Sequence, residues 1–168
     1  DLLESRGLGD VYKRQVFPED SQVPLAVVGQ LWGTNDVQTQ KAVRKLKEWH
    51  LVDVDWSERT LSLIDLHLDY LRASAKDDLA RWHAALLRGC GRSKLGRREE
   101  GREDDAYWGE GANVLHHLRG CGWEAGALGG ELTVLSLGFA GVDDEDAKGL
   151  AGMVASSGSL VKLVLGEN

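Results

Sequence analysis

The sequence predicts a mainly helical protein with short β-strands, built from three successive modules. Apolar residues recur at helical spacing on both sides of two short alternating segments between residues 51 and 64. Further helical patterns follow, and the last part of the chain repeats a leucine pattern at a shift of 28 residues. We therefore expect modules over residues 16–75, 76–130 and 131–168, after a leader over residues 1–15.

The composition fits a folded protein, because 42% of the 168 residues are hydrophobic. The net charge of −7 disfavours a general binder of nucleic acid, since it would repel phosphates. Cys90 and Cys121 have no Cys-x-x-Cys partner, so we expect reduced thiols and neither a disulfide framework nor a metal site. The chain has no long apolar run and no secretory-signal pattern, so we expect a cytoplasmic protein without a membrane partner.

The first fifteen residues lack a clean hydrophobic period. The string Gly7-Leu8-Gly9-Asp10-Val11-Tyr12-Lys13-Arg14-Gln15 resembles a translated sequencing adapter. We interpret residues 1–15 as a non-native or disordered leader; the alternative is a native helix that leads into Phe17.

Two helices are expected at the start of the first module. The first has its apolar period over residues 25–32 and stops at Gly33. Asn35, with Gln38 three residues later, is a variant capping box that opens a second helix. This helix is predicted to end near residue 50 and to have a buried apolar face and an exposed basic face. The apolar side is formed by Ala42, Val43, Leu46 and Trp49, and the basic side by Lys41, Arg44, Lys45 and Lys47.

A β-hairpin is expected next. Residues 51–56 alternate apolar with acidic side chains, residues 57–60 form a turn, and residues 61–64 return as the second strand. The alternating residues are Val52, Val54 and Trp56 against Asp53 and Asp55. Two helices, a hairpin and a further helix over 65–73 are the plan of a winged-helix domain.

One function of such a plan is DNA recognition, with the second helix in the major groove and the hairpin on the phosphate backbone. The basic face of the second helix suits this function. The hairpin does not, because Asp53, Asp55 and Glu58 would face phosphates with the wrong sign. A solvated charged face explains the lysines better, so nucleic acid is not the expected partner and a DNA-binding regulator remains the alternative.

Four short strings in this module match those of a known family. They are Phe17-Pro18-Glu19-Asp20, Leu31-Trp32, Leu63-Ile64-Asp65-Leu66 and Asp69-Tyr70-Leu71. They resemble the winged-helix part of the NB-ARC signalling ATPases of the apoptosis and resistance type. In that family a Phe-Pro-Glu-Asp opening, a Leu-Trp pair and a closing Leu-His-Asp-Leu motif recur.

The resemblance implies a nucleotide-sensing position. The family's histidine, which contacts the β-phosphate of ADP, corresponds to Ile64, while Asp65 matches the motif. Because an isoleucine cannot donate a hydrogen bond to phosphate, we expect a weakened ADP latch or a loss of nucleotide control. His67 would point to another face, so it does not take over this role. No cofactor-binding residue is therefore predicted here, and ADP or ATP belongs to the presumed full-length protein.

Residues 76–130 are predicted as a helical linker. Asp77 and Asp78 open one helix, which Gly89 stops. Residues 88–103 are expected to form a flexible, exposed basic loop. A second helix then begins at residues 104–105 and continues through Val114, Leu115 and Leu118.

Two further features of the linker concern its ends and its histidines. The string Leu118-Arg119-Gly120-Cys121-Gly122 echoes Leu87-Arg88-Gly89-Cys90-Gly91, so we interpret both as helix ends. The two linker helices resemble the short helical segment of the same ATPases, with His83, Leu86 and Leu87 in one helix and Asp104, Asp105, Tyr107 and Trp108 in the other.

The neighbours His116 and His117 point about 100° apart on a helix, so no metal site is predicted.

The last module has the plan of a leucine-rich repeat. Leu132, Leu135 and Leu137 recur 28 residues later as Leu160, Leu163 and Leu165. The residues between them suit a helix that the acidic run 143–146 opens. This strand-then-helix period resembles the ribonuclease-inhibitor-like class. One repeat cannot bury its own apolar face, so we expect the native chain to continue.

The outward strand positions Ser136, Lys162 and Val164 are the candidate protein-binding residues. No P-loop motif, nucleophile–base pair or paired carboxylates stands out, so no catalytic residue is predicted and the chain is not expected to be an enzyme.

The order of modules resembles the central-to-C-terminal junction of an NLR-type signalling protein. The expected function is to couple the binding of a protein ligand on the repeats to an upstream nucleotide-binding domain in cis. The alternatives are a DNA-binding winged-helix regulator and a non-switching interaction scaffold.

Overall fold

The computed structural model has a mixed α/β fold. It describes residues 16–18, 21–63, 68–99, 101–124 and 126–166. The predicted leader, together with Ile64, Asp65 and His67, lies outside these residues. The chain divides into two compact units, Asp1–Leu79 and Ala80–Asn168, which are described separately below. No helix in the described ranges is both long and apolar enough to cross a membrane.

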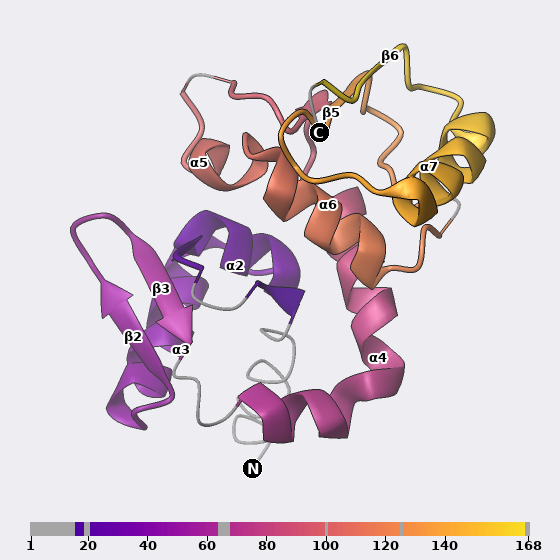
Figure 1. Cartoon of the computed structure of the whole chain (residues 1–168). Coiled ribbons are helices and arrows are strands. Elements are labelled where there is room, and N and C mark those ends of the chain that lie inside the picture. Colours follow the sequence, from indigo (N-terminus) through magenta and orange to yellow (C-terminus); the bar gives the residue numbers. More distant parts are fainter. Residues whose placement is uncertain (1–15, 19–20, 64–67, 100, 125, 167–168) are drawn as a thin grey trace. The chain divides into compact units, whose positions relative to one another are not determined.

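The described part of the first unit includes helices and a small antiparallel sheet (Figure 1). Its elements are β1 (Val23–Pro24), α2 (Leu25–Trp32), α3 (Asp36–Glu48), β2 (Val52–Asp55) and β3 (Thr60–Leu63). The sheet has the order β1-β3-β2, so β3 lies in its centre. The core is apolar, with Val28, Val43, Leu46, Val54 and Leu61 all buried.

Local signals in the sequence set these boundaries. The predicted capping box is confirmed, because Asn35 Oδ1 accepts from the Gln38 amide at 3.0 Å and Gln38 Oε1 accepts from the Asn35 amide at 3.3 Å. The predicted hairpin is also confirmed, with Val52 paired to Leu63 and Asp55 to Thr60. The Asp55 carboxylate accepts hydrogen bonds from the amides of Ser57 and Glu58, which closes the turn.

Two tryptophans differ from the prediction. The sequence predicts Trp49 on the buried face of the second helix, but the helix ends at Glu48 and Trp49 is 49% exposed as its C-cap. The alternation predicts Trp56 on the buried face of the first hairpin strand, but that strand ends at Asp55 and Trp56 is 39% exposed. The Arg44 guanidinium lies 5.5 Å from the centre of the Trp56 ring, a cation–π contact at the surface.

The chain continues as one long helix, α4 (Leu68–Gly89). The prediction of two separate helices, one over residues 65–73 and one that begins at Asp77, is wrong, because α4 covers both segments in its described residues. The sequence of α4 has no proline and no glycine before Gly89, so nothing in it interrupts the backbone. The division between the two units also falls within this helix.

The second unit is built on a parallel sheet with the order β4-β5-β6. The elements that follow α4 are β4 (Lys94–Leu95), α5 (Asp105–Trp108), α6 (Gly111–Gly120), β5 (Val134–Ser136), α7 (Asp144–Ser156) and β6 (Lys162–Val164). A helix precedes both β5 and β6, as Figure 1 shows. Its core includes Leu95, Trp108, Leu115, Leu118 and Leu135.

The structure corrects the expected elements of this unit in two places. The helix predicted from residue 104 onward is divided into α5 and α6, since the Gly109-Glu110-Gly111 segment interrupts it. The sheet also starts earlier than expected, because β4 precedes the predicted start of the last module at residue 131.

Candidate protein-binding face

The candidate site is the outer face of the parallel sheet, which we call the strand face. It consists of Lys94, Val134, Lys162, Ser136 and Val164. The register aligns Lys94 with Val134 and Val134 with Lys162 in one row, and Ser136 with Val164 in another. Successive side chains of a strand point to opposite faces, so the intervening Leu95, Leu135 and Leu163 point the other way. Leu95 and Leu135 are buried on that inner face.

The structure brings the three predicted residues onto one face and adds two more. Ser136, Lys162 and Val164 share the strand face with Lys94 and Val134, which are not among the predicted residues. Lys162 is exposed and the other four are partly exposed. The 28-residue period aligns β5 with β6, whereas β4 is aligned with β5 at a shift of 40 residues, so this period does not include it.

Gly96 lets the chain leave β4 close to the neighbouring strand. Its φ is +71°, and a Cβ atom placed there would lie 1.6 Å from the carbonyl oxygen of Ser136. Its amide donates to the carbonyl of Trp108 at 2.8 Å. A side chain at this position would force β4 away from β5, so glycine is needed for the strand face to form.

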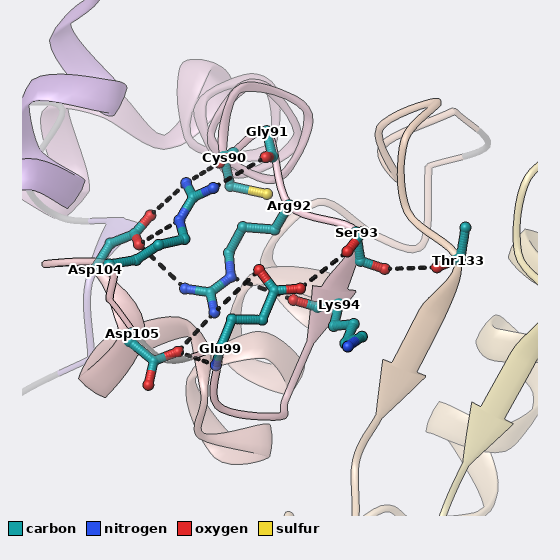
Figure 2. Close-up of polar contacts among 10 residues, drawn as sticks. Cys90, Gly91, Arg92, Ser93, Lys94, Glu99, Asp104, Asp105 and Thr133 are labelled. Atoms are coloured by element: carbon teal, nitrogen blue, oxygen red, sulfur yellow. Dashed lines mark hydrogen bonds and ion pairs between the residues drawn. The ribbon is translucent and has the colours of Figure 1, made fainter.

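A buried arginine holds the segment around β4. The Arg92 side chain is fully buried and lies 3.1 Å from Asp104 Oδ1 and 2.7 Å from Asp105 Oδ1 (Figure 2). Arg102 contacts Asp104 from the other side, at 3.0 Å. The prediction of an exposed basic loop over residues 88–103 is therefore wrong at Arg92, which is the centre of an ion-pair cluster.

The electrostatics of this cluster favour the charged carboxylate. Burial raises the pKa of Asp105, but hydrogen bonds from the Glu99 amide and from Arg92 outweigh it, so the pKa is lowered overall. Ser93 Oγ donates to Glu99 Oε1 at 2.9 Å, and Thr133 Oγ1 donates to the Ser93 carbonyl at 3.0 Å (Figure 2). These contacts connect the cluster to the start of β5.

A second ion pair joins α6 to α7. Arg119 donates to Asp146 Oδ1 at 2.8 Å and to Oδ2 at 2.5 Å, a two-point contact. Hydrogen bonding from Arg119, supported by the Asp143 amide and opposed by burial, lowers the pKa of Asp146. Asp146 and Asp143 also form a capping box at the start of α7, where the acidic run predicts that a helix begins. The same carboxylate therefore caps α7 and fixes it to α6.

A chain of buried polar rings lies between α4, α5 and α6. Tyr107 Oη and His117 Nε2 are 2.8 Å apart, and His117 Nδ1 and His83 Nδ1 are 2.9 Å apart. Burial lowers the pKa of His83 to about 3, and burial together with the two neighbouring histidines lowers that of His117 well below its usual range. Burial also raises the pKa of Tyr107. All three side chains are therefore uncharged at neutral pH.

The geometry of these rings assigns a structural role to His117. The sequence presented His116 and His117 as neighbours, and the partner that the sequence analysis missed is His83, 34 residues away. In the described ranges no group of three histidine, cysteine or acidic side chains is placed to hold a metal ion. Cys90 and Cys121 are buried free thiols, and burial raises the pKa of both, which makes them poor nucleophiles.

No protein-family model and no curated protein matches this sequence.

Proposed function

We propose that this chain is the relay part of a signalling protein of the NB-ARC type. In this proposal residues 16–75 form a winged helix, residues 76–130 a helical linker, and residues 131–168 the start of a leucine-rich repeat. The observation that supports it is the order of elements. Two helices and an antiparallel hairpin are followed by parallel strands in which Leu135 and Leu163 are in register at a spacing of 28 residues.

In the mechanism that we propose, binding at one site shifts a conformational equilibrium at another. A protein ligand binds the strand face, and this binding changes the conformation of the nucleotide domain of the parent protein, which holds ADP or ATP. A ligand shifts such an equilibrium only if it binds one state more tightly than the other. The fixed contacts of the second unit support this role, because Arg92 and Arg119 hold the strands and helices in one arrangement. Because these contacts keep the strand face rigid, a ligand that binds it moves the second unit as a whole and does not deform the sheet locally.

The proposal is tested on the parent protein that contains the nucleotide domain. Nucleotide is extracted from the purified wild-type protein and from an Ile64→His variant, and the ADP content is measured. We expect the variant to retain more ADP, because the histidine restores a donor to the phosphate. Equal ADP content in both proteins contradicts nucleotide switching and favours the non-switching scaffold.

The alternative function, DNA binding by the first unit, is favoured by the exposed basic side chains of α3. Two of these are engaged within the unit, since Arg44 lies over Trp56 and Lys47 Nζ donates to the Val54 carbonyl at 3.2 Å. The neighbouring hairpin carries Asp53 and Asp55, both exposed. Duplex binding measured between 50 and 200 mM salt separates the two functions, because phosphate contacts give a strong salt dependence at about these concentrations. Tight, salt-sensitive binding supports the alternative.

A further inference from the structure

The strand face carries two positive charges in a row, with an apolar side chain between them. Lys94, Val134 and Lys162 occupy the same register position on three adjacent strands. Neighbouring strands lie about 4.8 Å apart, so the outer two α-carbons are separated by about 10 Å. Val164 continues the apolar surface in the next row. The pattern across the strands is therefore cation, apolar, cation.

These two lysines differ from several other cations of the second unit. Arg92, Arg119 and Lys148 each contact a carboxylate within the chain. Across the described ranges, by contrast, the Lys94 and Lys162 ammonium groups make no ion pair. Glu99, the acidic residue that lies next to β4, instead contacts Ser93 and Arg92 (Figure 2). In a chain of net charge −7, this row is a local site of positive charge.

We propose that the strand face binds an acidic helical segment of a partner protein. In this segment two carboxylates seven residues apart lie over Lys94 and Lys162, and an apolar side chain between them lies on Val134. This inference rests on the proposed function, since it names the chemistry of the protein ligand.

The spacing favours a helix over an extended chain. Seven helical residues rise about 10.5 Å and return to nearly the same face, which matches the distance between the lysines. In an extended segment about 10 Å separates positions i and i+3, whose side chains point to opposite faces. An extended segment therefore cannot place both carboxylates over the row with the same spacing.

The test uses the whole chain and a synthetic probe. The probe is a fluorescein-labelled, alanine-rich peptide of about 18 residues, long enough to populate a helix, with glutamates at positions i and i+7 and leucine at i+4. Binding is measured by fluorescence anisotropy against the wild-type chain, a Lys94→Glu/Lys162→Glu variant and a Lys148→Glu control. Lys148 is an exposed lysine on α7, outside the strand face. Hydrogen exchange verifies that each variant is folded. If the double variant does not fold, the single variant Lys162→Glu replaces it in the binding measurement.

We expect the double reversal to weaken binding about tenfold or more, while the control binds as the wild type does. A second probe, with lysines in place of the two glutamates, is expected to prefer the double variant. The inference is overturned if the wild type does not bind the first probe, or if Lys148→Glu weakens binding as much as the double reversal. If the peptide binds as expected but Ile64→His does not change ADP retention, the relay function is contradicted and the acidic partner is supported. If Ile64→His raises ADP retention but the peptide does not bind as expected, only the acidic partner is contradicted.

Discussion

The two units of this chain bury different chemistry. In the described part of Asp1–Leu79 the interior is apolar except for Thr39, whose hydroxyl donates to the Asn35 carbonyl at 2.9 Å. Among the described residues of Ala80–Asn168, the buried side chains include the polar or charged groups of His83, Arg92, Asp104, His117 and Asp146. The first unit is thus stabilised mainly by non-directional burial of apolar surface. The second also depends on specific partners, each of which becomes destabilising when its counterpart is removed.

The largest effect that tests this contrast is expected from Arg92→Met. The change removes a cation that contacts both the buried Asp104 carboxylate and Asp105, while the contact of Arg102 with Asp104 is retained. Removing one partner of a buried ion pair destabilises by about 3–5 kcal/mol. Hydrogen exchange followed by mass spectrometry is expected to accelerate around β4 and α5 and to leave α2 and α3 unchanged. Arg97→Met, at an exposed position, is the control, and equal exchange in the two variants would contradict a stabilising role for the cluster.

Acid is expected to destabilise the second unit more than the first. The pKa values of His83 and His117 lie below 6.5 in the folded chain, so below pH 6.5 the unfolded chain takes up protons that the folded chain does not. The contribution of these histidines to the free energy of unfolding is fully present above pH 6.5 and is lost as the pH falls. For His83 the loss continues until the pH reaches its folded-state pKa of about 3. At pH 5 the loss is about 2 kcal/mol for His83, and His117 adds a loss in the same direction.

The measurement is hydrogen exchange at pH 7 and pH 5, corrected for the pH dependence of chemical exchange. Protection is expected to fall in α6 and β5 and to persist in α2 and α3. Tyr107 and His116 are the other titratable side chains that contact this pair, and both are retained in the experiment. An equal loss of protection in the two units would show that the buried histidines do not cause the acid sensitivity.

A smaller effect is expected from Gly120→Ala, which has a matched control. A Cβ atom at Gly120 would lie 2.4 Å from His83 Cε1 and Nε2, so the ring has to move and its 2.9 Å contact with His117 is strained. Overpacking of this kind destabilises by about 1–3 kcal/mol. Gly89 ends α4 in the same Leu-Arg-Gly-Cys-Gly string, but nothing lies near its added Cβ. Urea denaturation is expected to show a loss for Gly120→Ala only; equal midpoints for both variants would contradict the tight packing of His83.

The same contrast explains which parts of the fold were predictable. The capping box at Asn35, the start of α7 at the acidic run 143–146 and the hairpin of β2 with β3 are set by residues close in sequence, so local patterns indicated them. The pairing of His83 with His117 and of Arg119 with Asp146 joins residues 34 and 27 apart without any period. A basic run such as that around Arg92 has the composition of a loop, and only the folded chain brings the acidic partners to it.

The candidate site was predictable to the same extent. The repeat located Ser136, Lys162 and Val164, because a period of 28 residues places equivalent positions on adjacent strands. Lys94 was missed, since β4 has only two residues and the segment to β5 contains the additional helix α5. The echo of the Leu-Arg-Gly-Cys-Gly string at the ends of α4 and α6 was the available signal that the parallel sheet begins before residue 131.

The smallest effect is expected in the first unit, from Asn35→Ala. The substitution removes the side-chain acceptor for the Gln38 amide, and the loss of such a cap destabilises by about 1 kcal/mol. Lys41→Ala, an exposed change in the same helix, is the control. Because no titrating group takes part in this cap, the difference in urea midpoint between the two variants is expected to be the same at pH 7 and pH 5. A difference that grows in acid would mean that the first unit shares the proton-linked stability of the second, and the contrast between the two interiors would then be wrong.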